Sequence, residues 1–491
     1  MLGFDIEKYI KLQTQKILDR VNASEKLYLE FGGKLFDDYH ASRVLPGFGH
    51  DTKIKLLETL KDKLEIIICI SSFAIVQNKI RADYGITYEM DVLRLIDNFR
   101  NLNLSINGVV ITQYEGQVNC DIFKKKLENF GIKVYTHKYI KGYPMDIEIM
   151  LSDSGCGANE YVETTKPLII VTAPGPGCGK LATCISQLYH ENRKGNKSHY
   201  AKFETFPVWN LPLKHPINIA YEAATADLGD INMIDPFHFG AYNEVAVNYN
   251  RDIEVFPLVK NILQRITKQS TYNSPTDMGV NMLGHCISDD NVVCNAAKQE
   301  VIRRYYRAIC DNKSGAASDK TVERIKLLMD ELDVTLWDRE VVKPAHEKSE
   351  KSGSPAVAIK LKSGEIITGR TTDLMTAGSS VILNAIKHLA NLNDDILLVS
   401  ENILTPIINL KKILLNDENV LLNINDMLTA LSVSAVTNPT ASIALSKVQE
   451  LNDTEAHSTH MFTDVEETMY RNLKIHLTAE PKYSSKKLFI E

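Results

Sequence analysis

The sequence lacks the features that mark several special classes of protein. Its 491 residues include eight cysteines but no CxxC pair, and its longest apolar stretches are the short runs at 64–70 and 167–173. Paired cysteines are typical of zinc sites and disulfide scaffolds, so we expect neither. A membrane-spanning helix needs about 18 consecutive apolar residues, and residues 1–21 lack the apolar centre of a secretory signal. We therefore expect a cytoplasmic protein.

The chain also carries little net charge. Lys and Arg number 56 against 62 Asp and Glu, which gives a net charge of −6. Proteins that bind nucleic acids or membrane surfaces are commonly basic, so we expect neither as a partner. Hydrophobic residues make up 44% of the chain and charged residues 24%, which excludes a disordered protein. At roughly 150 residues per domain, the length predicts about two to four domains.

Short β-branched runs alternate with helical segments between about residues 24 and 173. This alternation is typical of βαβ units in a mostly parallel sheet. The expected strands are 26–31, 64–70, 107–114, 132–137 and 167–173, and the expected helices are 51–63, 88–103 and 118–130. We predict an α/β fold, with a P-loop-like or Rossmann-like N-terminal region and a smaller C-terminal α/β domain.

Changes in composition suggest the domain boundaries. We expect an N-terminal α/β part at 1–153, a P-loop-like part at 154–340 and a C-terminal α/β domain at 350–491. Alternatively, the first two parts share one continuous sheet. The polar stretch 343–355 is expected to be a linker or exposed loop.

The most informative segment is the glycine-rich sequence TAPGPGCGK, which lies between an apolar strand and an amphipathic helix. Gly175, Gly177 and Gly179 let main-chain amides approach a phosphate closely, and the start of a helix adds partial positive charge. Lys180 would supply a point charge for the outer phosphates of a nucleotide. This strand, loop and helix are the context that a P-loop requires.

The match to a P-loop is incomplete. Pro174 stands where the usual pattern has glycine, and Leu181 stands where a Ser or Thr normally holds magnesium. Thr183 would have to take over that role, although it points about 200° away on a helical wheel. The alternative is a glycine-rich turn with a solvated lysine.

Further polar residues follow the loop in the chain. Lys202 ends a probable strand, at the edge where open α/β sheets bind ligands. Asp227 and Asp235 are candidate magnesium ligands, because carboxylate oxygens suit that ion. The alternative for Asp227 and the nearby Asp230 is that they cap helices or turns. Arg251 is either an anion clamp or a structural ion-pair partner.

A second cluster lies near the start of the chain, after the strand at 26–31. Lys34, His40 and Arg43 are candidates for catalysis or for contact with a second substrate, with His40 as the group that titrates near neutral pH. A tight loop stabilised by Asp–Arg pairs would explain the same residues.

Near the C-terminus, His457 and His460 are weak evidence for zinc, because no third ligand stands near and strand spacing would separate them.

Several of these segments together make the chain similar to the bacterial family known as domain of unknown function 1846. The resemblance spans essentially the whole chain and rests on LYLEFGGKLFDDYHASRVLPGF, GITYEMDVLRLID, VVITQY, TAPGPGCGK, AKFETFPVWNLPLKHPINIAYEAATADL, MIDPFH, SPTDMGVNM and EAHST. It implies a bacterial cytosolic protein but no particular activity. The loop also resembles that of dethiobiotin-synthetase-like ligases, in which a strand-end lysine follows the loop helix as Lys202 does here; this is a likeness of fold only.

Two hypotheses for the function remain open. In the first, the chain is an enzyme that uses ATP with magnesium, such as a ligase or phosphotransferase acting on a small-molecule substrate. In the second, it is a non-catalytic protein that senses a phosphorylated metabolite or serves assembly, which the absence of a Ser or Thr after Lys180 favours. A nicotinamide-dependent oxidoreductase fits less well, because the glycine spacing lacks the three-residue step of a dinucleotide loop. We expect a homo-oligomer on general grounds.

Overall fold

The computed structural model describes residues 2–81, 84–140, 142–414 and 420–484. The chain divides into two compact units, Met1–Ala297 and Lys298–Glu491. Among the described residues, no helix combines the length and the apolar character needed to cross a membrane.

The first unit is built on a seven-stranded sheet with the order β11-β8-β1-β7-β2-β5-β6. All neighbouring strands in it are parallel. The strands are β1 (Lys26–Phe31), β2 (Leu64–Ser71), β5 (Ile106–Tyr114), β6 (Val134–Lys138), β7 (Leu168–Thr172), β8 (Ser198–Phe203) and β11 (Gly279–Val280). The α/β fold with a mostly parallel sheet is therefore confirmed, and strands from the predicted ranges 1–153 and 154–340 lie in this one sheet.

Burial explains why these segments form strands. Every residue of β2 and β7 is buried, so both faces of the sheet are covered at its centre. Such strands need continuous β-branched and apolar side chains, and LEIIICIS and LIIVT provide them. In the sheet, β7 lies between β1 and β2. The chain runs from β7 to β8 on the β1 side and from β2 to β5 on the β2 side, so the direction of strand order reverses beside β7 and creates a switch point there. Ligands of open α/β sheets commonly bind at the carboxyl edge of such a point.

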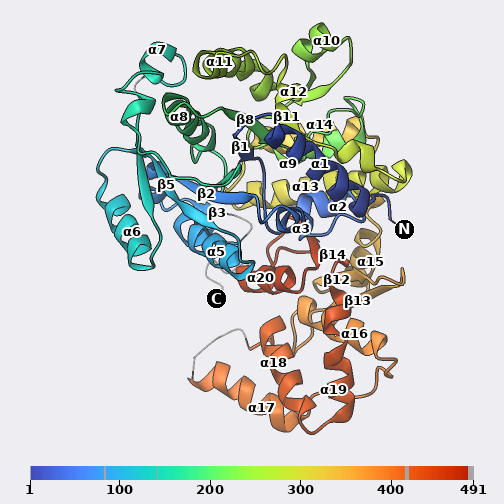
Figure 1. Ribbon diagram of the computed structural model, residues 1–491. Coiled ribbons are helices and arrows are strands. Elements are labelled where there is room, and N and C mark those ends of the chain that lie inside the picture. Colours follow the sequence, from blue (N-terminus) through green and yellow to red (C-terminus); the bar gives the residue numbers. More distant parts are fainter. Residues whose placement is uncertain (1, 82–83, 141, 415–419, 485–491) are drawn as a thin grey trace. The chain divides into compact units, whose positions relative to one another are not determined.

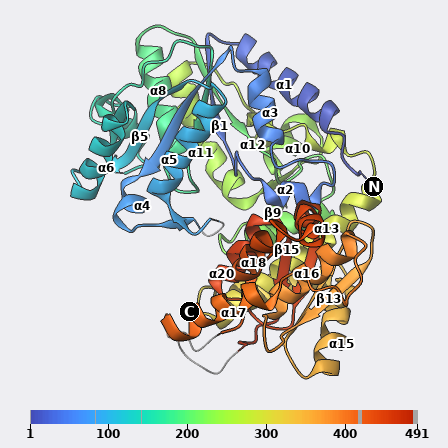
Figure 2. The same cartoon turned by 90° about the horizontal axis from the view of Figure 1, so that it is seen from below.

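Helices cover both faces of this sheet. α8 and α11 lie on one face, and α5 and α6 lie on the other (Figures 1 and 2). The helices are α1 (Ile6–Asn22), α2 (Tyr39–Val44), α3 (Thr52–Thr59), α4 (Ser72–Val76), α5 (Tyr88–Asn101), α6 (Val118–Asn129), α7 (Ile147–Met150), α8 (Lys180–Arg193), α9 (Pro216–Ala224), α10 (Pro236–Tyr242), α11 (Asn250–Thr267) and α12 (Pro275–Met278). Two small antiparallel pairs, β3 (Ile80–Arg81) with β4 (Ile86–Thr87) and β9 (Asn232–Ile234) with β10 (Val247–Tyr249), complete the unit.

The second unit contains a four-stranded mixed sheet with the order β13-β12-β14-β15. Its strands are β12 (Ala356–Lys360), β13 (Ile366–Arg370), β14 (Glu455–Ser458) and β15 (His476–Ala479), of which only the last two pair in parallel. Its helices are α14 (Asp319–Glu331), α15 (Val342–Ser352), α16 (Ala377–Leu389), α17 (Glu401–Asn409), α18 (Ile424–Ala435), α19 (Pro439–Ser446) and α20 (Asp464–Asn472), and α13 (Asp290–Lys313) contains the boundary between the units.

The predicted linker at 343–355 is wrong. Residues Val342–Ser352 form helix α15, which buries Val342 and Ala345 and ends at Gly353 in the left-handed conformation. The apolar side of this helix is so narrow that its polar residues dominate the sequence pattern. A short helix with two buried side chains therefore has the composition of a loop.

Candidate functional site

The glycine-rich loop joins the end of β7 to the start of α8, at the carboxyl edge of the sheet. Gly177 and Gly179 have φ angles of +76° and +81°, which favour glycine. Gly175 is required for a different reason, because a Cβ at this position would come within 2.2 Å of the Tyr88 hydroxyl oxygen. A Cβ at Gly177 would meet no atom within 4 Å, so the tip of the loop is open.

The loop leaves a run of main-chain amides without acceptors. Pro174 and Pro176 have no N–H, and the amide of Gly175 donates to the Cys178 thiol. In the part of the chain that the structure describes, the amides of residues 177–182 donate to no acceptor, and no side chain caps the helix. The first amides of a 14-residue helix, together with its dipole, favour an anion at this position.

Two lysines lie near Cys178 of the loop. Burial raises the pKa of the Cys178 thiol, but the ammonium groups of Lys180 and Lys79 both lie close enough to oppose that rise. Lys180 is half-buried at the start of α8, and the Lys79 ammonium lies 5.1 Å from the ring centre of Tyr88. The Thr112 hydroxyl donates to the Cys178 carbonyl at 3.0 Å and holds the loop against β5. We call Gly175–Lys180 with Lys79 the loop site.

Thr183 does not face the loop site. It is fully buried, and its hydroxyl accepts a hydrogen bond from the Cys69 thiol of β2 at 3.3 Å. The hydroxyl is therefore occupied within the core between α8 and the sheet, where a magnesium ion bound to phosphates cannot reach it.

Lys202 is already neutralised by protein groups. Its ammonium lies 2.5 Å from an Asp252 oxygen, 2.8 Å from a Glu204 oxygen and 2.5 Å from the Tyr249 hydroxyl. Burial disfavours the charged lysine, but Asp252 and Glu204 outweigh it and hold the Lys202 pKa well above its usual value. Burial, reinforced by Asp252, raises the pKa of Glu204 to about 8 despite Lys202. This cluster of Lys202, Glu204, Asp252 and Tyr249, here the Lys202 cluster, is compact and charge-balanced.

The two aspartates predicted to bind magnesium lie in different settings. Asp227 is exposed on the turn after α9. Asp235 is fully buried and caps α10: it accepts hydrogen bonds from the amides of Phe237 and His238 at 3.0 Å and from the Thr276 hydroxyl at 2.7 Å. Its oxygens are thus committed to helix capping. Neither aspartate belongs to a His, Cys, Asp or Glu triplet close enough to hold a metal ion among the described residues.

Arg251 forms a structural ion pair. Its guanidinium donates to both oxygens of the buried Asp230, at 2.5 and 2.9 Å. Of the two alternatives left by the sequence, the structure thus supplies the ion pair, and its partner is Asp230.

Lys34, His40 and Arg43 follow β1 in the chain. The Lys34 carbonyl accepts from the Lys53 ammonium at 2.9 Å. The His40 ring packs edge-on against Phe206, and the Arg43 guanidinium lies over Tyr39. Asp38, held by Lys53 at 2.7 Å, stabilises the same loop. A role for Lys34, His40 and Arg43 in catalysis stays a prediction.

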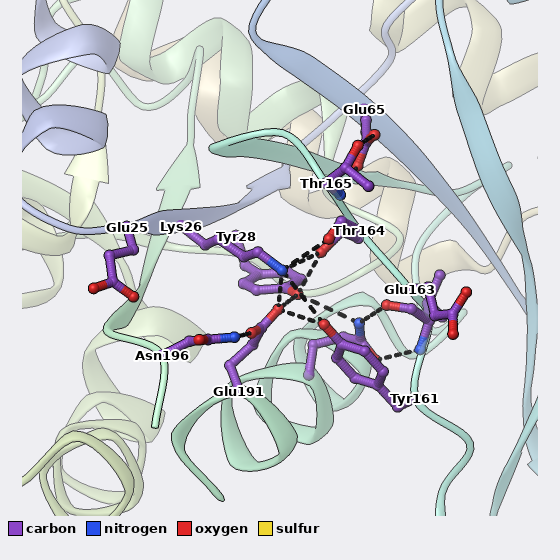
Figure 3. A network of polar contacts seen from close by, with 12 residues as sticks. Glu25, Lys26, Tyr28, Glu65, Tyr161, Glu163, Thr164, Thr165, Glu191 and Asn196 are labelled. Atoms are coloured by element: carbon purple, nitrogen blue, oxygen red, sulfur yellow. Dashed lines mark hydrogen bonds and ion pairs between the residues drawn. The ribbon is translucent and has the colours of Figure 1, made fainter. Parts of the chain in front are cut away.

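At the amino end of the sheet, a buried polar network fastens α8 to β1 (Figure 3). The carboxylate of Glu191, near the end of α8, accepts from Lys26 at 2.7 Å, Tyr28 at 2.9 Å, Tyr161 at 2.7 Å and Asn196 at 2.6 Å. Burial alone would raise the pKa of Glu191, but these donors hold it below its usual value. The network therefore fixes the helix whose other end carries the loop site.

Replacing Glu191 by Gln should lower the free energy of unfolding by about 1–3 kcal/mol at pH 7, because donors that bonded a carboxylate then meet a neutral amide. Since the folded-state pKa of Glu191 is depressed, its contribution is present above the unfolded pKa and is lost as the pH falls through the acid range. Urea unfolding at pH 7 and at acid pH measures both effects. Glu163→Gln, an exposed neighbour, is the control; equal effects of the two variants would contradict this role.

Lys79, Tyr88 and Thr112 were missed by reasoning from the sequence. Lys79 follows α4, Tyr88 begins α5 and Thr112 lies near the end of β5. All three therefore lie near the carboxyl edge of the sheet. That placement is the one signal that would have found them, because in a parallel sheet all carboxyl ends share one edge.

Comparison with known proteins identifies relatives along the whole chain. Residues 2–333 match the family described as Domain of unknown function DUF1846, N-terminal, and residues 337–489 match its C-terminal counterpart. UPF0371 proteins of two strains of Clostridium botulinum and of Clostridium tetani are each 55% identical over 497 residues, which covers 99% of this chain and 99% of each relative. The chain belongs to the family of domain of unknown function DUF1846.

Proposed function

We propose that the first unit binds a phosphorylated small molecule, with a nucleotide as the first candidate, at the loop site. The observation that carries this proposal is the run of amides at residues 177–182 without acceptors in the described structure, flanked by Lys180 and Lys79. Amides at the start of a helix bind phosphate oxygens directly, and two ammonium groups balance the charge of the anion. The position of β7 beside the switch point of the sheet supports a ligand site at this carboxyl edge.

The residues do not fit a magnesium ion held by the loop in the manner of a P-loop. Leu181 has no ligand atom, and the Thr183 hydroxyl is buried against Cys69. Lys202, which a ligase-like site would direct to phosphate, is held by Asp252 and Glu204. These features favour a protein that binds a phosphorylated metabolite over one that hydrolyses ATP. We therefore propose binding that does not require magnesium; an ATP-dependent reaction with Lys34, His40 and Arg43 on a second substrate is the alternative.

A thermal-shift series tests the proposal. The purified chain is heated with ATP, ADP, AMP or inorganic phosphate, each with and without magnesium. A ligand at 100 times its Kd adds about 2.7 kcal/mol to the free energy of unfolding, which raises the Tm visibly. We expect a rise with at least one phosphorylated compound in the absence of magnesium.

Lys180→Ala should weaken that binding about 10- to 150-fold, because a charge-assisted contact to phosphate is worth roughly 1.5–3 kcal/mol. Lys194→Ala is the matched control, since Lys194 is the exposed residue that ends the same helix. No shift with any compound, or equal losses in both variants, would contradict a phosphate site at the loop. A shift that appears only with magnesium would favour the ATP-dependent enzyme instead.

A further inference from the structure

Three side chains that are far apart in the sequence converge in the second unit. His346 lies on α15, His457 lies on β14 and Glu480 directly follows β15. The Nε2 atoms of His346 and His457 lie 3.1 and 3.6 Å from the same Glu480 oxygen. The nitrogen and oxygen atoms of the three residues all lie within 4.8 Å of one another. None of them belongs to the loop site or the Lys202 cluster.

The Thr478 hydroxyl orients the ring of His457. Its Nδ1 lies 2.9 Å from the Thr478 hydroxyl oxygen. That hydroxyl donates its single proton to the Ala456 carbonyl at 3.1 Å and accepts from the Arg339 guanidinium at 2.9 Å. When that proton points to the Ala456 carbonyl, Nδ1 of His457 donates to the Thr478 hydroxyl. The lone pair of His457 is then on Nε2, on the side of Glu480.

The Nε2 atom of His457 faces Glu480 inside the second unit. His457 is fully buried, and its Nε2 has no hydrogen-bond partner among the described residues. A buried imidazole nitrogen that has no hydrogen-bond partner and lies 3.6 Å from a carboxylate oxygen is placed as a metal ligand would be.

We propose that His346, His457 and Glu480 bind one divalent transition-metal ion, with zinc as the first candidate. Two imidazoles and one carboxylate are ligands that zinc takes, and tetrahedral bonds of 2.0–2.1 Å place two ligand atoms about 3.3 Å apart. The two spacings of 3.1 and 3.6 Å to Glu480 match that value. Thr478 orients His457 through Nδ1, as an outer partner of a ligating histidine does. Three protein ligands leave one position for water or a small anion.

A second triplet, His215, Asp290 and Cys294, also lies close together. Unlike the first triplet, it lacks an imidazole lone pair for a metal ion. The Nδ1 of His215 accepts from the Ile217 amide at 3.2 Å, so the proton is on Nε2. That Nε2 lies 3.0 Å from Asp290, to which it donates. The ring therefore offers no lone pair to a metal ion. His460, only three residues from His457, contacts Ser458 and Phe462.

The test measures zinc binding by the full-length chain. Purified protein stripped of metal is dialysed against zinc, and bound metal is counted by mass spectrometry; competition with a chelator gives the Kd. We expect one zinc per chain. His457→Gln and Glu480→Gln should each weaken zinc binding at least 100-fold, and Thr478→Val should weaken it about 10–100-fold. His460→Gln, a substitution of another buried histidine, should leave the Kd unchanged.

Two further measurements distinguish loss of the zinc site from misfolding and from binding by a cysteine. His346→Gln changes a side chain that is 24% exposed, so it should fold normally, which circular dichroism checks, and still lose zinc. Cobalt in place of zinc should give visible bands without the near-ultraviolet band of a thiolate ligand. Each of three results would overturn the proposal. The full-length chain could bind no stoichiometric zinc, the folded His346→Gln variant could bind zinc as tightly as the parent chain, or cobalt could give a thiolate band that Cys294→Ser removes.

Discussion

Lys202→Met should lower the free energy of unfolding by about 3–5 kcal/mol, because breaking a buried ion pair leaves a charge without compensation. Lys202 lies between Asp252 and Glu204, and the three side chains are only 10–13% exposed. Methionine keeps most of the volume of lysine but removes its positive charge. Glu204, whose pKa is about 8, is already mostly protonated at pH 7, so the Asp252 carboxylate is then left without its cation in a site of low polarity.

Urea unfolding at pH 7 measures this loss, with Lys197→Met as the control, because Lys197 is exposed immediately before β8. If the loss arises from uncompensated charge, adding Asp252→Asn to Lys202→Met should restore part of the stability. A loss below about 1 kcal/mol would show that the Lys202 cluster behaves like a surface ion pair, and would contradict the account.

Glu204→Gln should remove a fall in stability between pH 5 and pH 8. In the folded chain, burial raises the pKa of Glu204 to about 8, whereas in the unfolded chain the carboxyl has its ordinary pKa of 4.5. Between these values the folded state binds more protons, so the free energy of unfolding decreases as the pH rises and becomes level above about 8. The loss is on the order of 4 kcal/mol for such a shift.

Urea unfolding at pH 5.5, 7 and 8.5 measures the slope. Glutamine is neutral at each pH, and Asp252 still balances Lys202, so the variant should show a much flatter curve than the parent chain. Glu191→Gln provides the contrast, because the depressed pKa of Glu191 affects only the acid range. A Glu204→Gln curve that runs parallel to that of the parent chain would refute the elevated pKa.

The sheet was predictable because its strands depend on local pattern. β2 and β7 are buried on both faces, and continuous β-branched runs are the direct result. The glycine loop was predictable for the same reason, since a strand, turn and helix are adjacent in the chain. Two of its glycines nevertheless have neighbours that the sequence does not show: Gly175 packs against Tyr88, and Gly179 packs against Thr112.

Contacts over long sequence distance account for what was not predictable. Lys202 ends its strand as expected, but its partner Asp252 comes from α11, 50 residues later. A lysine at a strand end has the same sequence signal whether it meets a phosphate or a carboxylate. Likewise, the sequence showed no further ligand near His457. His346 lies 111 residues earlier, on a helix that has the composition of a linker, and Glu480 follows a different strand.

The most direct test of the proposed function observes the loop amides themselves. Glycine labelled with ¹⁵N and proline labelled with ¹³C at the carbonyl select Pro–Gly peptides, which occur in this chain only at Gly47, Gly175 and Gly177. The Gly177 amide belongs to the run without acceptors, the Gly175 amide donates to Cys178, and Gly47 lies beside Phe4. These three signals thus include the amide expected to bind and its internal controls.

The ligand is the phosphorylated compound that gives the largest thermal shift, or inorganic phosphate if none does. If the loop site binds phosphate through its main chain, saturating ligand should move the Gly177 amide signal strongly, because the amide gains an anionic acceptor, and should leave Gly47 in place. A Gly177 signal that stays unmoved at saturation would contradict the central claim that the amides at the start of α8 bind phosphate.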